Sequence, residues 1–165
     1  MRLEYIWIDG NKTPQLRSKT RFAPSIEPWN FDGGSTNQGS LKDSDRMLKP
    51  VKSFKDPFFE GGYLVLCEVC WHDGTPHESN FRSKFANLNY GNLSPKFGLE
   101  QEITFLHPVN KQPLGLLLNP EEQGQFYCGV GRQNIVGRDI ILEFEKKCEL
   151  AHIPLAGINA EVMPG

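Results

Sequence analysis

Sixteen glycines and twelve prolines interrupt this 165-residue chain, and they restrict its helices and strands to short segments. Their combined share exceeds the average of about 12%. Between them the sequence is mixed: 38% of the residues are hydrophobic, 11% are aromatic and 23% are charged. We therefore expect an ordered chain with numerous turns, folded as one domain or as two small ones.

The charges and the apolar stretches exclude two classes of partner. Lysine and arginine number 18 against 20 acidic residues, so the net charge is −2, and the chain contains no run of five like charges. A nucleic-acid-binding surface is therefore not expected. The apolar stretches, such as residues 63–67, are much shorter than the roughly 20 residues of a membrane helix. The first residues also lack the apolar region of a secretory signal, so we expect a cytoplasmic protein.

Four segments before residue 76 have the composition of β-strands. Residues 9–11 form a turn signal between the first two segments, which predicts a hairpin. The segments are residues 3–8, 15–22, 46–51 and 63–71. Residues 23–44 are dense in turn-forming residues and have no period, so they are predicted as a long loop. The sequence therefore predicts a four-stranded, mostly antiparallel sheet.

Beyond residue 76 the pattern predicts both helices and strands. Residues 79–88 have helical spacing, with Ser79 or Asn80 as the cap. Residues 138–151 place an apolar stripe along one helix face. Residues 97–105 and 155–163 are predicted as strands.

Two glutamates share a face of the predicted strand 97–105. Successive side chains of a strand point to opposite faces, so Glu100 and Glu102 lie together, about 6.6 Å apart. Such carboxylates could hold Mg²⁺ or Mn²⁺, but the solvated face of an amphipathic strand gives the same pattern. Glu161 has the same two interpretations. The Cys67 and Cys70 side chains point to opposite faces of a strand, so both are predicted to be reduced thiols in the core.

Ten strings together, in order along nearly the whole chain, resemble glutamine synthetase of the eukaryotic type. They are residues 5–10, 16–21, 29–33, 49–50, 56–58, 64–68, 97–102, 127–131, 137–140 and 157–164. The resemblance implies an α+β fold: a β-grasp-like N-terminal domain over residues 1–76, then the first part of the antiparallel-sheet catalytic domain over residues 77–165. It also implies ATP-dependent ligation of ammonia to glutamate through γ-glutamyl phosphate.

The resemblance also assigns roles to four residues. Glu100, Glu102 and Glu161 match family positions that bind two divalent cations, Mg²⁺ or Mn²⁺, and Glu100 also lies near the ATP. Asp32 matches the aspartate that reaches the neighbouring subunit's site, binds ammonium and helps to deprotonate it. Glutamate, ammonia and ATP are thus the expected partners, in a homo-oligomeric ring whose active sites lie between subunits.

The resemblance covers less than half of a family member, its N-terminal part only. Further metal ligands and the arginines that bind glutamate and phosphate would follow Gly165 in the family. We therefore expect this chain alone to be inactive. The alternative is a non-catalytic, degenerate relative that acts as a binding partner of a full-length paralogue.

Overall fold

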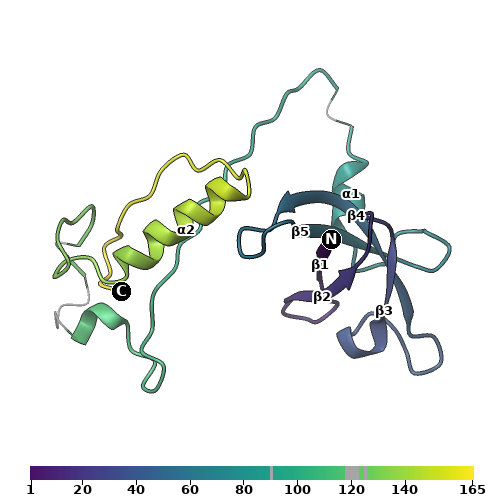
Figure 1. The fold of residues 1–165 in the computed structure, drawn as a ribbon, viewed down its shortest axis with the longest axis horizontal. Helices are drawn as coiled ribbons and strands as arrows, with labels where there is room; N and C mark the ends of the chain where they lie inside the picture. The colour runs from purple at the N-terminus through teal and green to yellow at the C-terminus, as the bar shows by residue number, and fades with distance from the viewer. Residues whose placement is uncertain (90, 118–122, 125) are drawn as a thin grey trace. The chain divides into compact units, whose positions relative to one another are not determined.

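The computed structural model describes residues 1–89, 91–117, 123–124 and 126–165 (Figure 1). The chain divides into two compact units, Met1–Pro95 and Lys96–Gly165. The domain boundary after residue 76 that the resemblance implies remains a prediction.

The first unit is built around a mixed five-stranded sheet, labelled in Figure 1. The strands are β1 (Arg2–Ile8), β2 (Leu16–Phe22), β3 (Trp29–Asp32), β4 (Asp45–Lys55) and β5 (Tyr63–Cys70), in the order β2-β1-β5-β4-β3. β1 pairs in parallel with β5, and the other three pairs are antiparallel. The predicted hairpin and the predicted α+β character are confirmed. The β-grasp label remains a prediction.

The four-stranded sheet predicted from the sequence is one strand short. β3 lies inside the segment predicted as a loop, where Asn30 and Asp32 give a turn-like composition. It forms because it pairs with β4, with Phe31 opposite Arg46, and because the Phe31 side chain is buried. β4 is also longer than predicted, since its register shift between Pro50 and Lys52 accommodates the proline within the strand.

The core of this unit follows the alternation of the strands. Leu3, Tyr5 and Trp7 of β1 are buried, and the residues between them are half-buried. They pack with apolar side chains of β4 and β5, among them Leu48 and Val65. The Tyr5 hydroxyl donates a hydrogen bond of 2.6 Å to the Glu27 carbonyl, so its polar atom is satisfied.

The cysteines of β5 are core thiols, as predicted. Cys67 and Cys70 are both buried, and neither is in a disulfide. Burial raises the pKa of the Cys67 thiol to about 12, so this thiol stays protonated at neutral pH.

The short helix α1 (Phe81–Ala86) completes the first unit. The Asn80 side chain caps it by accepting a hydrogen bond from the Ser83 amide at 3.1 Å, which confirms one of the two caps considered. The same side chain donates to the Val69 carbonyl at 3.1 Å. The start of the helix is therefore tied to β5.

The second unit contains the predicted long helix, α2 (Arg138–Leu150), and a 3₁₀ turn, η2 (Leu114–Leu117). The strands predicted at residues 97–105 and 155–163 are wrong: the described part of this unit has only an isolated bridge between Leu106 and Pro113. A strand needs a partner for its backbone groups. Here both segments are largely exposed.

Candidate functional site

Asp32 lies at the end of β3 and begins the 3₁₀ turn η1 (Gly33–Thr36). Its carboxylate is exposed and accepts two short hydrogen bonds. Oδ1 accepts from the Gly34 amide at 3.0 Å, and Oδ2 accepts from the Ser35 hydroxyl at 2.5 Å. The aspartate therefore caps its own turn.

These contacts also fix the charge of Asp32. The hydrogen bond from Ser35 is the largest cause that lowers the pKa of the Asp32 carboxyl, and the one from the Gly34 amide adds to it, against a smaller effect of desolvation. Hydrogen bonds to the ionised form favour it. Asp32 is thus an exposed, fully ionised carboxylate at neutral pH, suited to binding a cation.

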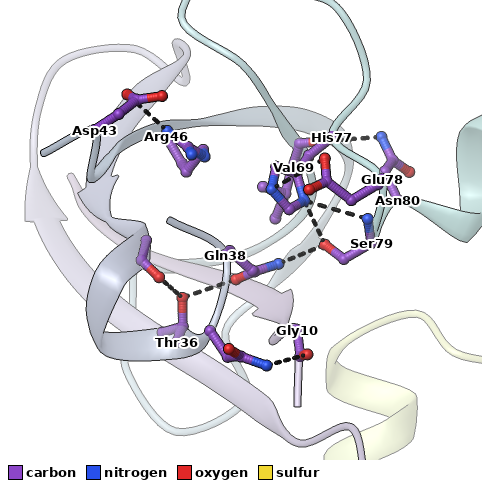
Figure 2. Close-up of polar contacts among 12 residues, drawn as sticks. Gly10, Thr36, Gln38, Asp43, Arg46, Val69, His77, Glu78, Ser79 and Asn80 are labelled. Atoms are coloured by element: carbon purple, nitrogen blue, oxygen red, sulfur yellow. Dashed lines mark hydrogen bonds and ion pairs between the residues drawn. The ribbon is translucent and has the colours of Figure 1, made fainter. Parts of the chain in front are cut away.

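The loop that follows Asp32 is held by a buried glutamine (Figure 2). Gln38 is only 1% exposed. Its Nε2 donates to the Ile8 carbonyl at 3.1 Å and to the Ser79 hydroxyl at 2.8 Å, and its Oε1 accepts from the Thr36 hydroxyl at 2.8 Å. Gln38 therefore joins three segments that are distant in sequence: the end of β1, the turn η1 and the segment before α1.

The hydrogen bonds continue from Ser79 to His77, as Figure 2 shows. The Ser79 hydroxyl lies 3.0 Å from Nδ1 of His77, and the Ser79 amide donates to the same nitrogen at 3.2 Å. Nδ1 is thus an unprotonated acceptor, which leaves the proton of the neutral ring on Nε2, 3.4 Å from a Glu78 carboxylate oxygen. The ring is 4% exposed and packs against Trp71, with centroids 5.0 Å apart.

The state of His77 predicts a loss of stability in mild acid. Burial, aided by the Arg46 guanidinium and opposed by Glu78, holds the pKa of His77 below its ordinary value. The unfolded chain then binds the proton of His77 more tightly than the folded chain does. The contribution of neutral His77 to the stability of the first unit is therefore complete above about pH 6.5, and it is lost as the pH falls through the pKa of His77 in the folded state. We expect the urea midpoint of the first unit to fall between pH 7 and pH 5.

The matched variants for this experiment are His77→Gln and His72→Gln, since His72 is exposed. The His77→Gln variant is expected to lose the fall in midpoint over this pH range, whatever its absolute stability. The His72→Gln variant is expected to keep it. An unchanged pH profile in His77→Gln would show that another group titrates.

The three glutamates of the predicted metal site all lie in the second unit, and all are exposed. Within the described ranges, no three histidine, cysteine, aspartate or glutamate side chains come close enough to hold a metal ion. Glu161 accepts a hydrogen bond of 2.8 Å from the Asn159 side chain. The structure does not gather Glu100, Glu102 and Glu161 into one centre, and their role as metal ligands remains a prediction.

Glu161 does lie beside another segment that carries the resemblance. The Cys128 amide donates to the Ala160 carbonyl at 2.8 Å, and the Gly124 amide donates to the Val162 carbonyl at 3.3 Å. The neighbouring Cys128 and, to a smaller extent, Glu161 raise the pKa of the Tyr127 phenol. Two strings that are 30 residues apart are therefore adjacent in this unit.

Sequence reasoning identified Asp32 but missed Gln38 and His77. A glutamine in a polar loop and an isolated histidine carry no local pattern that predicts burial. Their burial depends on contacts between residues 30 to 41 positions apart, such as Gln38 with Ser79, which no local window contains.

No described helix has the length and apolar character needed to cross a membrane.

Comparison with known proteins finds no family model that matches the chain, but it does find individual relatives. The glutamine synthetase of Streptomyces viridochromogenes is 44% identical, over 99% of this chain and 51% of the relative. That of Neurospora crassa is 42% identical, over 98% of this chain and 48% of the relative. The glutamine synthetase nodule isozyme of Medicago sativa is 40% identical, over 98% and 49%.

These relatives come from a bacterium, a fungus and a plant, and the alignment with each of them covers 98–99% of the chain. The chain spans about half the length of the curated relatives it matches. The resemblance noted in the ten sequence strings is thus confirmed: along nearly its whole length the chain is similar to about half of each of these proteins named glutamine synthetase.

Proposed function

We propose that residues 1–165 form the N-terminal part of a glutamate–ammonia ligase, which uses ATP to make glutamine through γ-glutamyl phosphate. The observation that carries this proposal is the similarity of 40–45% identity along the whole chain to proteins named glutamine synthetase. In that enzyme, homo-oligomeric by family, Asp32 would serve the neighbouring subunit's site. The chain alone is proposed to be inactive.

The geometry of Asp32 supports one part of its proposed role more than the other. An exposed carboxylate whose pKa is held low by the Ser35 and Gly34 hydrogen bonds attracts an ammonium ion. The same low pKa makes it a weak general base, because proton transfer is most efficient when the pKa of the base is near the working pH. We therefore assign Asp32 the binding and orientation of ammonium, and only a minor part in its deprotonation.

The divalent metal and ATP enter the proposal only because the glutamine synthetase family uses them. The donor chemistry of Glu100, Glu102 and Glu161 suits Mg²⁺ or Mn²⁺, but the described residues do not form a centre. The fit therefore fails for the chain by itself, and no step is assigned to a metal or to ATP here. Three carboxylates that remain apart do not hold the pair of cations that would neutralise a transferring phosphoryl group, which is the physical reason to expect no activity.

The first test is a direct assay of the purified 165-residue chain. Phosphate release from ATP that depends on both glutamate and ammonium is expected to stay at background. Turnover above background would contradict the proposed inactivity of the chain alone.

The second test places the chain in a complete enzyme. A chimera in which residues 1–165 replace the matching segment of the Streptomyces viridochromogenes relative is expected to make glutamine. In this chimera Asp32→Asn is expected to raise the KM for ammonium at least tenfold, because a hydrogen bond to a charged group contributes about 1.5–3 kcal/mol. Glu60→Gln removes one exposed negative charge elsewhere, and it should leave this KM unchanged.

The alternative, a non-catalytic binding partner of a full-length paralogue, gives different results. It predicts an inactive chimera, and it predicts that the isolated chain co-purifies with a full-length relative and changes its activity. An inactive chimera that is folded and assembled would favour this alternative.

A further inference from the structure

We infer that Gln38 is a positioning residue for Asp32: its buried carboxamide fixes residues 33–44, here called the clamp loop, against β1 and the segment before α1. The functional meaning of this inference rests on the proposed role of Asp32. The effect of Gln38 on the placement of the loop does not depend on that role, and it can be tested without substrates.

The clamp loop begins and ends beside Asp32. Asp32 pairs with Asp45 in the β3–β4 register, so the loop is an excursion between these two residues. Its base is closed by the Gly33 amide, which donates to the Ser44 carbonyl at 2.7 Å, and the Gln38 amide donates back to the Gly33 carbonyl at 2.8 Å. The position of Gln38 therefore determines the turn that starts at Asp32.

Both polar atoms of the Gln38 carboxamide have hydrogen-bond partners. Both hydrogens of Nε2 have acceptors outside the loop, at Ile8 and Ser79, and Oε1 accepts from Thr36 inside the loop. A buried polar side chain that lost these partners would carry the cost of unpaired groups. The bonds thus select one placement of the loop on the sheet.

A second contact makes the fit close at the turn after β1. The Gly10 amide donates to the Thr36 carbonyl at 2.9 Å. The Asn37 side chain donates to the Gly10 carbonyl at 2.9 Å, a bond that is drawn at Gly10 in Figure 2. A Cβ at position 10 would lie 2.8 Å from Cγ of Gln38, which is too close without a shift. The loop and the turn therefore fit only because residue 10 is a glycine.

The placement of the clamp loop reaches Asp32 through the two groups that donate hydrogen bonds to its carboxylate. Gly34 and Ser35, which hold its carboxylate, lie between the loop base and Thr36, the residue that Gln38 holds. If Gln38 were an ordinary core residue, removing its bonds would weaken the whole unit evenly. If it positions Asp32, the change is concentrated at Gly34, Ser35 and the Asp32 carboxyl.

The experiment compares three variants of the 165-residue chain. Gln38→Met keeps the side-chain volume and removes the hydrogen bonds. Ser79→Ala removes one of the two acceptors of Nε2 and leaves Gln38 in place, so it tests the inference if Gln38→Met fails to fold. Lys42→Met is the matched control, because Lys42 is exposed in the same loop. The readouts are amide hydrogen exchange of the Gly34 and Val65 amides, and the Asp32 pKa from NMR titration of its carboxyl carbon.

We expect the Gly34 amide to exchange at least tenfold faster in Gln38→Met, and several-fold faster in Ser79→Ala, relative to the Val65 amide of the same sample. The Asp32 pKa should rise toward its ordinary value in both variants and stay unchanged in Lys42→Met. Two results would overturn the inference: an unchanged Gly34 rate and Asp32 pKa in both variants, or equal acceleration of Gly34 and Val65. Neither readout involves ammonium, glutamate or ATP, so the result is independent of the chimera assay.

Discussion

Replacing Leu48 by alanine is expected to lower the free energy of unfolding of the Met1–Pro95 unit by about 2–5 kcal/mol. Leu48 is fully buried in β4 and lies opposite Val69 of β5 on one side and Trp29 of β3 on the other. Truncation would remove apolar contacts and leave a cavity at the centre of the sheet. A small unit with one core has few other contacts to compensate.

Tryptophan fluorescence is a specific probe for this prediction. The three tryptophans of the chain, Trp7, Trp29 and Trp71, all lie in the first unit, so urea unfolding followed by their emission reports on that unit alone. Leu41→Ala is the matched control, since the Leu41 side chain is fully exposed, at 104%. A loss in Leu48→Ala no larger than that in Leu41→Ala would show that the sheet does not form the core described.

The sequence predicted those parts of the fold that local pattern determines. The β-branched and aromatic residues of β1, the turn at residues 9–11 and the alternation of residues 15–22 specify a hairpin without help from the rest of the chain. The apolar stripe of α2 does the same for a helix. Leu3, Tyr5 and Trp7 are buried because successive side chains of a strand point to opposite faces of the sheet.

The parts that the sequence did not predict depend on distant partners. β3 has only four residues, and it becomes a strand because β4 lies beside it. The opposite error occurred at residues 97–105, where the alternation is clear, and at residues 155–163, since no partner strand is present in the described second unit. Alternating polarity therefore shows which residues could form a strand, and only the pairing decides whether they do.

The candidate site likewise contains one residue that the sequence predicted and one that it did not. Asp32 was found because a string of residues around it resembles a family, and its exposed carboxylate fits the proposed role. Gln38 was missed because its place in the core comes from Ile8 and Ser79, residues 30 and 41 positions away. The chemistry of a site can thus be inferred from residue types, whereas the residues that hold it in place become visible only in three dimensions.

Limited proteolysis is expected to cut the chain first between residues 87 and 104. The described residues of this range are exposed and belong to no helix or strand, so their backbone can enter a protease without prior unfolding. The four strand segments predicted from the sequence all lie before residue 76, so the sequence alone predicts a protected core that ends near this residue. The structure moves this limit to the end of α1, because the His77 amide and the Asn80 side chain both donate to the Val69 carbonyl at 3.1 Å.

Thermolysin, which cleaves before large apolar residues, gives this prediction an internal control. Leu99 and Leu41 are equally exposed, at 98% and 104%, but Leu41 lies in the clamp loop, between Ser40 and Asp43, which are joined by two backbone hydrogen bonds. Mass spectrometry of early digests should therefore find cleavage at Leu99 well before cleavage at Leu41. First cleavage at Leu41, or before residue 76, would contradict the prediction, since exposure alone would then decide where the chain opens. Faster cleavage at Leu41 in Gln38→Met, with the rate at Leu99 unchanged, would connect the protection of the loop to the same buried carboxamide that holds Asp32.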